Sequence, residues 1–220
     1  MLFSRINFYK MNNRLKSFIE VLIIIVLFVF FSYIVQSNID FFKGIIGDGF
    51  LGMFFYVLIT IVAIVIAPIS TMPLLPIASN LWGVFSAALL SIIGWTVGAF
   101  IAFIIARTYG VPIIKKFVPI EKINKLEKMV PRENVFWGVV FLRMIVPVDI
   151  LSYALGLFSK MKTRDYVLAT LIGVSPFDFV FAYLGKMTIQ YQLAAFLVIA
   201  IILIIGFIVK EKRRKKRVLF

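Results

Sequence analysis

The sequence predicts an all-α polytopic membrane protein, with about four full transmembrane helices and two oppositely oriented re-entrant hairpins arranged as an inverted repeat. Three observations lead to this fold class. Of the 220 residues, 62% are hydrophobic and 15% are charged, whereas soluble domains are about 45–50% apolar and about 25% charged. Prolines interrupt two of the apolar stretches, and the basic residues gather in a few segments between stretches. The chain therefore has more apolar surface than one soluble core could bury.

Hydropathy marks six apolar stretches, each close to the ~20 residues that a helix needs to cross a bilayer. They are 18–35, 51–67, 84–106, 135–158, 166–184 and 193–209. The first follows a basic start and could instead be a signal peptide that ends near Val35, Gln36 and Ser37. We favour an uncleaved anchor, because the run is longer than the ~7–15 residues of a signal core.

The basic residues predict the orientation. Four Lys or Arg precede the first stretch, seven lie in 107–133, three in 160–164 and seven in 210–217. If all six stretches crossed the membrane, 107–133 would lie on the side opposite to both tails, which contradicts the positive-inside rule. The conflict disappears if two stretches enter and leave the bilayer on the same side.

Prolines show which two stretches these are. Pro68, Pro73 and Pro76 follow the 51–67 stretch, and Pro147 lies within 135–158. Proline removes a backbone donor and clashes with a continuing helix, so each stretch should break at membrane depth. We expect a first hairpin that opens to the outside and a second that opens to the inside.

Four crossings then remain, at 18–35, 84–106, 165–185 and 193–209. Each hairpin precedes a glycine-bearing crossing, which gives two related units of opposite orientation, 51–110 and 135–186. In such inverted repeats, broken helices meet near the midplane and form the site.

We expect three parts in the chain: a basic cytoplasmic segment (1–17), a single integral membrane domain (18–209) and a basic cytoplasmic tail (210–220). The basic segments should bind the anionic lipids of the inner leaflet of a bacterial plasma membrane, with both termini in the cytoplasm. Nucleic acid is not an expected partner, since anionic headgroups would saturate a juxtamembrane basic cluster. The sequence leaves a homo-oligomer open.

The chain contains no His and no Cys. These absences exclude His-based acid–base catalysis, a Cys nucleophile, disulfides and Cys/His metal sites. We expect no cofactor, no bound metal and no catalytic residue.

Four charges fall within or at the edge of the apolar stretches: Glu20, Arg143, Asp149 and Asp178. Glu20 lies one turn into the first crossing, where an acid suits the helix dipole. Each charge costs about 2.5–3.5 kcal/mol at a helix centre on insertion scales, so each needs a partner or a water-filled cavity. A pair of Arg143 with a carboxylate could simply neutralise both charges and fix the hairpin. Alternatively, Arg143 binds a lipid phosphate with its planar guanidinium, while Asp149 or Asp178 exchanges a proton or competes for the arginine.

Small residues recur every four positions at Gly94, Gly98, Ala102 and Ala106. This spacing lets another helix approach closely, so we interpret it as a packing face. Arg107 follows directly, and we expect it at the inner interface in contact with lipid phosphate.

The motif Phe141-Leu142-Arg143, with Pro147-Val148-Asp149 and the run 152–157 after it, resembles the VTT-domain (SNARE-associated) branch of the DedA superfamily. The resemblance continues through 164–166, 173–176 and 183–185, and in the first half through Gly94, Gly98 and the run 103–110. It covers about 50–186. It implies paired re-entrant hairpins and the movement of phospholipids or polyprenyl-phosphate carriers across the bilayer.

The leading hypothesis is therefore a lipid flippase or scramblase. One alternative is a non-transporting membrane organiser or assembly protein that uses the small-residue face and the basic tail. A remote alternative is an intramembrane aspartyl hydrolase, in which Asp149 and Asp178 would share a proton and activate water.

Overall fold

A computed structural model describes residues 13–47, 49–66, 70–114, 134–145 and 148–201. These residues form helices and short connections, and no strand occurs among them. The all-helical prediction is therefore confirmed for this part of the chain. The predictions for 1–12 and the basic tail, and those for Pro68 and Pro147, lie outside the described residues.

The chain starts with two helices at nearly a right angle. α1 (Asn13–Ser37) contains the first predicted crossing, and α2 (Ile39–Ile46) follows after a bend of 92°. The sequence analysis did not predict α2. Its apolar residues share one face, and Asp40, Lys43 and Gly44 lie on the other.

The first broken pair consists of α3 (Phe50–Ile66), a 3-10 turn (Met72–Leu74) and α4 (Leu75–Trp82). The helix ends as predicted just before the proline-rich run. Pro73 and Pro76, however, occupy the first turns of the 3-10 segment and of α4, so they begin helices rather than interrupt one. The reason is that the first turn of a helix has no need of the missing N–H group. Gly83 (φ 81°) then turns the chain into α5 (Val84–Ile114).

The second broken pair consists of α7 (Val135–Ile145) and α8 (Val148–Phe158), and it leads into α9 (Thr163–Lys186). α7 is described up to Ile145 and α8 from Val148, so the predicted break at Pro147 itself lies outside the described residues. Pro176, in contrast, lies inside α9, and the helix continues through it. A last described helix, Ile189–Ile201, follows.

Within the described ranges, two helices, α5 over Val84–Pro112 and α9 over Thr163–Lys186, are long and apolar enough to cross a membrane, or three if the bent pair α1–α2 counts as one. α3, α7, α8 and Ile189–Ile201 are shorter. α7 and α8 have 11 residues each, about 16 Å at ~1.5 Å per residue, which is about half of a ~30 Å hydrocarbon core.

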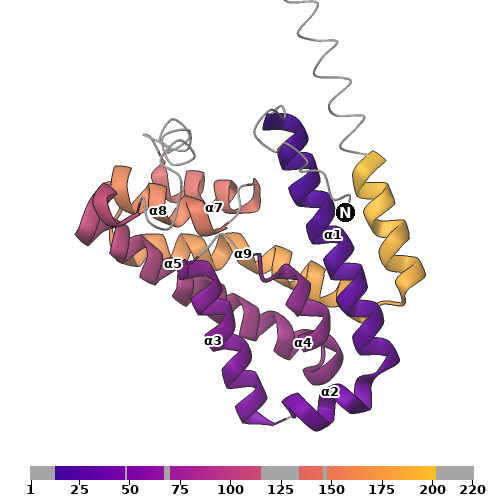
Figure 1. Cartoon of the computed structure of the whole chain (residues 1–220). Coiled ribbons are helices and arrows are strands. Elements are labelled where there is room, and N and C mark those ends of the chain that lie inside the picture. The colour runs from indigo at the N-terminus through magenta and orange to yellow at the C-terminus, as the bar shows by residue number, and fades with distance from the viewer. Residues whose placement is uncertain (1–12, 48, 67–69, 115–133, 146–147, 202–220) are drawn as a thin grey trace, which may run out of the picture.

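The two long helices, α5 and α9, each contact both broken pairs. α5 packs against α3 and α8, while α9 packs against α7 and α4, and the two long helices also pack on each other. α4 contacts α5 as well. Figure 1 shows α5 and α9 crossing the middle of the molecule, with α7 and α8 on one side and α3 and α4 on the other. Helices of the units 51–110 and 135–186 therefore pack against each other.

Side-chain contacts give the relative directions of these helices. α3 and α5 run parallel, because Gly94 faces Thr60 and Gly98, one turn later, faces Ile64. α5 and α9 run antiparallel: Phe103 stacks on Tyr166, near the start of α9, while Phe85 contacts Phe179 near its end.

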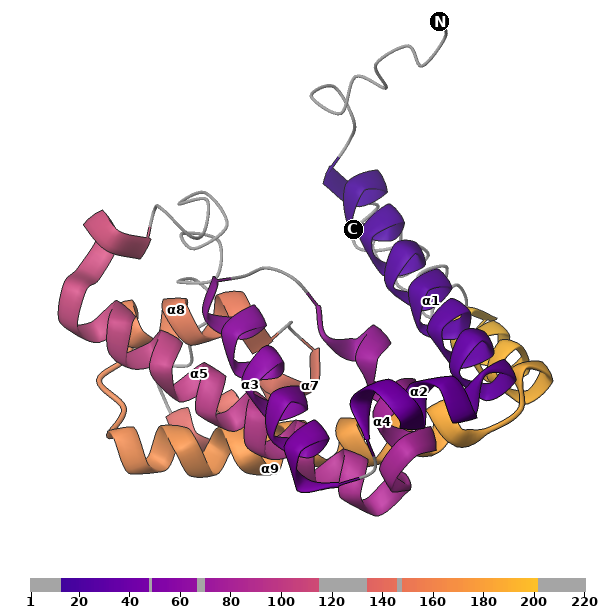
Figure 2. The ribbon, with the colours of Figure 1, turned by 60° about the horizontal axis from the view of Figure 1, so that its bottom comes forward.

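The flanking helices close on the end of α9 through a polar clamp. The Gly185 carbonyl accepts hydrogen bonds from Ser32 Oγ (3.2 Å), Gln36 Nε2 (3.4 Å) and Asn80 Nδ2 (3.0 Å). Gln192 Nε2 donates to Ser32 Oγ at 2.5 Å. α1 and the helix Ile189–Ile201 therefore lie side by side, as both views show (Figures 1 and 2). The clamp satisfies carbonyls that a helix end leaves unpaired.

Candidate functional site

Arg143 is a buried cation in the last turn of α7, with 4% of its surface exposed. Its Nη2 donates hydrogen bonds to Ser152 Oγ of α8 (3.1 Å) and to the Tyr166 hydroxyl of α9 (2.5 Å). The guanidinium carbon also lies 5.3 Å from the centroid of the Tyr166 ring. These contacts offset part of the cost of removing a cation from water. Arg143 thereby connects α7 and α8 to α9.

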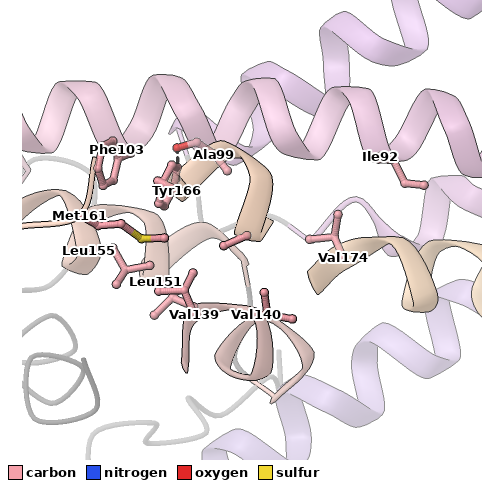
Figure 3. Close-up of a cluster of buried hydrophobic side chains, with 11 residues drawn as sticks. Ile92, Ala99, Phe103, Val139, Val140, Leu151, Leu155, Met161, Tyr166 and Val174 are labelled. Atoms are coloured by element: carbon pink, nitrogen blue, oxygen red, sulfur yellow. Dashed lines mark hydrogen bonds between the residues drawn. The ribbon is translucent and has the colours of Figure 1, made fainter. Parts of the chain in front are cut away.

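Tyr166 is the residue on which this arrangement depends. It is fully buried, and its hydroxyl accepts the bond from Arg143 while donating to the Ala99 carbonyl of α5 at 3.0 Å. Its ring stacks on Phe103 with the centroids 3.9 Å apart and the planes at 16°. Figure 3 shows Tyr166 between Phe103 and Ala99 in a cluster of buried hydrophobic side chains. Tyr166 therefore fixes the position of Arg143 relative to α5.

Arg107 lies on the other side of the same aromatic pair. Its guanidinium carbon is 4.2 Å from the centroid of the Phe103 ring, so two arginines enclose two stacked rings. Arg107 is exposed and donates to the carbonyls of Met161 (2.8 Å) and Ser159 (2.7 Å). Within the structure it therefore holds the connection between α8 and α9. The phosphate contact at the interface that the sequence suggests for Arg107 stays a prediction.

α8 reaches the end of α3. The hydroxyl of Tyr153, in α8, donates to the Val65 carbonyl in the last turn of α3. Trp95 Nε1, in α5, donates to Thr71 Oγ1 at 2.9 Å, just before the 3-10 turn. Since Ser152, next to Tyr153, contacts Arg143, the arginine lies beside the meeting point of the two broken helices.

The small residues of α5 face other helices of the same chain. A Cβ atom at Gly94 would lie 2.9 Å from Thr60 Cβ, and one at Gly98 would lie 2.9 Å from Ile64 Cβ. Ala102 is fully buried in a cluster with Tyr153 and Ala154 of α8. The small-residue face is thus occupied by α3 and α8.

Two further glycines bring helices together at the site itself. A Cβ at Gly173 of α9 would lie 2.6 Å from Arg143 Cβ and 2.9 Å from the Val140 carbonyl oxygen. A Cβ at Gly156 of α8 would lie 2.5 Å from Ala106 Cβ and from the Phe103 carbonyl oxygen. Only glycine allows these approaches, which bring α7 onto α9 and α8 onto α5.

The structure describes the two aspartates, Asp149 and Asp178, to different extents. Asp149 is the second residue of α8, and the structure describes its backbone but not its side chain. Asp178 lies in α9 with 1% of its surface exposed. The structure does not pair it with Arg143, because the arginine side chain points toward Tyr166. The twelve residues from Tyr166 to Asp178 correspond to about 18 Å along the helix.

Sequence analysis named Arg143 but did not give a functional role to its neighbours Ser152 and Tyr166, or to Phe103, which stacks on Tyr166. Tyr166 carried one usable signal, a hydroxyl within the apolar stretch that follows the second hairpin. No group of three or more His, Cys, Asp or Glu side chains that could hold a metal occurs in the described part of the chain.

A family model described as the VTT domain matches residues 67–187, from the end of the first hairpin's outer arm through the end of α9. The match contains Arg143, Tyr166, Phe103 and the glycine contacts, while α1, α2 and α3 precede it. No curated protein and no solved structure matches the chain. With more than half of its residues within this match, and with apolar helices long enough to cross a bilayer, the chain belongs to the VTT-domain family of the DedA superfamily and is an integral membrane protein.

Proposed function

We propose that this protein is a membrane transporter, a flippase or scramblase that moves phospholipid or polyprenyl-phosphate lipid between the bilayer leaflets, and that it is not an enzyme. One observation carries the proposal: a buried arginine contacts α8 beside the place where this helix reaches the end of α3. A guanidinium presents N–H groups in one plane that match two phosphate oxygens. Arg143 is therefore the group that binds the lipid phosphate at membrane depth.

Arg143 can exchange a hydroxyl contact for a phosphate. Two of its contacts, with Ser152 and Tyr166, are to neutral hydroxyl oxygens. Charge-assisted bonds to an anion are about twice as strong as neutral ones. A phosphate that reaches the hairpin ends therefore displaces one hydroxyl, which takes over again when the lipid leaves.

The membrane arrangement that we propose has four crossings and two re-entrant hairpins, α3–α4 and α7–α8, with both termini in the cytoplasm of a bacterial cell. Helix directions support it. If all six stretches crossed in turn, α3 and α5 would run antiparallel and α5 and α9 parallel. The observed directions are the reverse of both. A hairpin that returns to its own side explains why its first arm, α3, runs parallel to the following crossing α5. It also explains why α5 and α9, before and after the second hairpin, run antiparallel.

Single cysteines in this cysteine-free chain test the arrangement. Phe85, 67% exposed at the start of α5, should react with a membrane-impermeant thiol reagent from outside after Phe85→Cys. Glu121→Cys and Ser159→Cys should react only from inside. Reaction of Glu121→Cys from outside would instead support six crossings.

Lipid exchange in vesicles tests the proposed function. Purified protein should speed the exposure of fluorescent phospholipid, or of a fluorescent polyprenyl phosphate, to a quencher added outside. Arg143→Ala should slow this exchange roughly 10- to 100-fold, because a hydrogen bond to a charged group contributes about 1.5–3 kcal/mol. Arg143→Lys keeps the charge without the planar fork and should give an intermediate rate.

The matched control is Lys43→Ala, which removes an exposed cation from α2, away from the hairpin ends. Its exchange rate should equal that of the parent. If Arg143→Ala, with an unchanged circular dichroism spectrum, exchanges lipid as fast as the parent, Arg143 is not the phosphate-binding group.

The structure also bears on the alternative of a non-transporting organiser. That role would use the small-residue face of α5 toward a partner protein, but Gly94 and Gly98 already pack against α3. An organiser is therefore favoured only if the folded parent protein exchanges none of the lipids tested. An aspartyl hydrolase would instead cleave a labelled helical peptide. Asp149→Asn and Asp178→Asn would each lose this activity.

A further inference from the structure

Asp178 is a fully enclosed acid without a hydrogen-bond partner. It lies in the middle of α9 with 1% of its surface exposed. No N–H or O–H donor among the described residues reaches either of its carboxyl oxygens. Buried polar groups are nearly always hydrogen-bonded, so an unpartnered carboxyl needs an explanation.

The part of α9 around Asp178 lies beside buried apolar residues and a pair of hydroxyl groups. Ala182, one turn further along α9, belongs to a buried cluster with Tyr56 of α3 and Ala87 of α5. The Tyr56 hydroxyl and Ser91 Oγ are 2.7 Å apart in a buried hydrogen bond. Tyr56 lies within electrostatic range of Asp178. The acid therefore faces a hydroxyl pair that joins the first hairpin to α5.

Few other charged or titratable groups face this place. α4 contains no titratable residue, and α5 contains none before Arg107. Tyr33 of α1 is exposed. On α7, Arg143 is directed toward Tyr166 and not toward Asp178. Tyr56 is thus the titratable neighbour of Asp178 among the described side chains of the packed helices.

The pair Tyr56–Ser91 and the pair Arg143–Tyr166 occupy related places. In each, a polar residue on the first arm of a hairpin contacts a hydroxyl group of the crossing that follows: Tyr56 on α3 with Ser91 on α5, and Arg143 on α7 with Tyr166 on α9. The pair on α7 and α9 contains the cation Arg143. The pair on α3 and α5 is uncharged, as is the whole run 50–106, but the acid Asp178 of α9 lies within electrostatic range of it.

We propose that Asp178 is a proton-binding site, which carries a proton in the conformation described here. An isolated carboxylate in an apolar interior is disfavoured so strongly that the group takes up a proton instead. Loss of this proton breaks the carboxyl O–H bond, leaves the electron pair on the oxygen and transfers the proton to water. The carboxylate then accepts a hydrogen bond from Tyr56, which gives up its bond with Ser91.

Proton binding at Asp178 is thereby linked to the packing of the first hairpin. Because Tyr56 belongs to α3, a new bond from Tyr56 to Asp178 pulls this arm toward α9. On the proposed function, this movement changes how the two hairpin ends meet, so lipid exchange responds to pH through Asp178. The proton site itself does not depend on lipid transport.

Infrared spectroscopy of the full-length protein in lipid vesicles tests the proton site directly. With ¹³C-labelled aspartate, the parent should show the carbonyl band of a protonated carboxylic acid at near-neutral pH. The band should be lost in Asp178→Asn, which is neutral and of similar shape, and should remain in the matched variant Asp165→Asn at the start of α9. Asp178→Glu, with ¹³C-labelled glutamate, keeps an acid and should restore a band.

Absence of the band in the parent, or its persistence in Asp178→Asn, overturns the proposal. If Asp178→Asn does not fold, the test falls on Asp178→Glu, where an unchanged aspartate band has the same meaning. The link to transport is measured separately: the exchange rate of the parent should depend on pH, and that of Asp178→Asn should not. A band without any lipid exchange would leave the proton site standing and reject only the transport function.

Discussion

Replacement of Gly156 by leucine is expected to have the largest effect on folding of any substitution considered. A side chain at Gly156 begins with a Cβ 2.5 Å from Ala106 Cβ and from the Phe103 carbonyl oxygen, both parts of α5 that cannot rotate away. α8 must therefore move off α5. Overpacking of this kind costs about 1–3 kcal/mol and occasionally more. Thermal unfolding in detergent, followed by circular dichroism, should show a clearly lower midpoint.

Gly44 of α2 provides the control, because a Cβ there meets no atom within 4 Å. Gly44→Leu adds the same atoms in the same class of secondary structure and should leave the midpoint nearly unchanged. Equal losses in the two variants would mean that the close approach of α8 and α5 does not limit stability. Gly156→Ala adds only the Cβ atom, so the decrease of its midpoint measures the cost of this first close contact alone.

Tyr166→Phe should give the second large effect. The phenylalanine keeps the stack on Phe103 but removes one hydroxyl that serves both Arg143 and the Ala99 carbonyl. Leaving such buried partners unsatisfied costs about 1–3 kcal/mol, more when one of them is charged. We expect a lower free energy of unfolding and a slower lipid exchange, because Arg143 loses the contact that fixes its position. Denaturant titration and the vesicle assay measure the two effects.

Tyr183→Phe is the matched control on the same helix. Tyr183 is 59% exposed, so loss of its hydroxyl should change neither the stability nor the exchange rate. If Tyr166→Phe behaved like this control, the bond between Tyr166 and Arg143 would contribute nothing to the site.

The sequence predicted the broken helices because proline has a local effect on the backbone. The structure has separate helices on the two sides of each predicted break: α3 ends at Ile66, and α7 ends at Ile145 before α8 begins at Val148. The exact roles of Pro73 and Pro76 were not predicted, since proline both ends one helix and suits the first turn of the next. α2 was missed because an eight-residue helix gives only a weak periodic signal beside a long apolar stretch.

Prediction of the site was less complete, since it depends on contacts between residues distant in the sequence. Arg143 was identifiable because a cation in an apolar stretch is costly. Its partner Tyr166 is 23 positions away and belongs to another helix. Whether Asp178 would pair with Arg143 depended on the direction of one side chain, which periodicity and composition do not specify.

The sequence by itself determined that this chain is helical, lies in a membrane and breaks two of its apolar stretches, because composition and proline act locally. Only the tertiary structure decided that α3 runs parallel to α5, that Arg143 is held by Tyr166 and Ser152, and that Asp178 is left without a hydrogen-bond partner in the described structure. These features arise when helices from both hairpins pack around α5 and α9. Glycines at the contacts allow that packing, and it sets which polar groups meet.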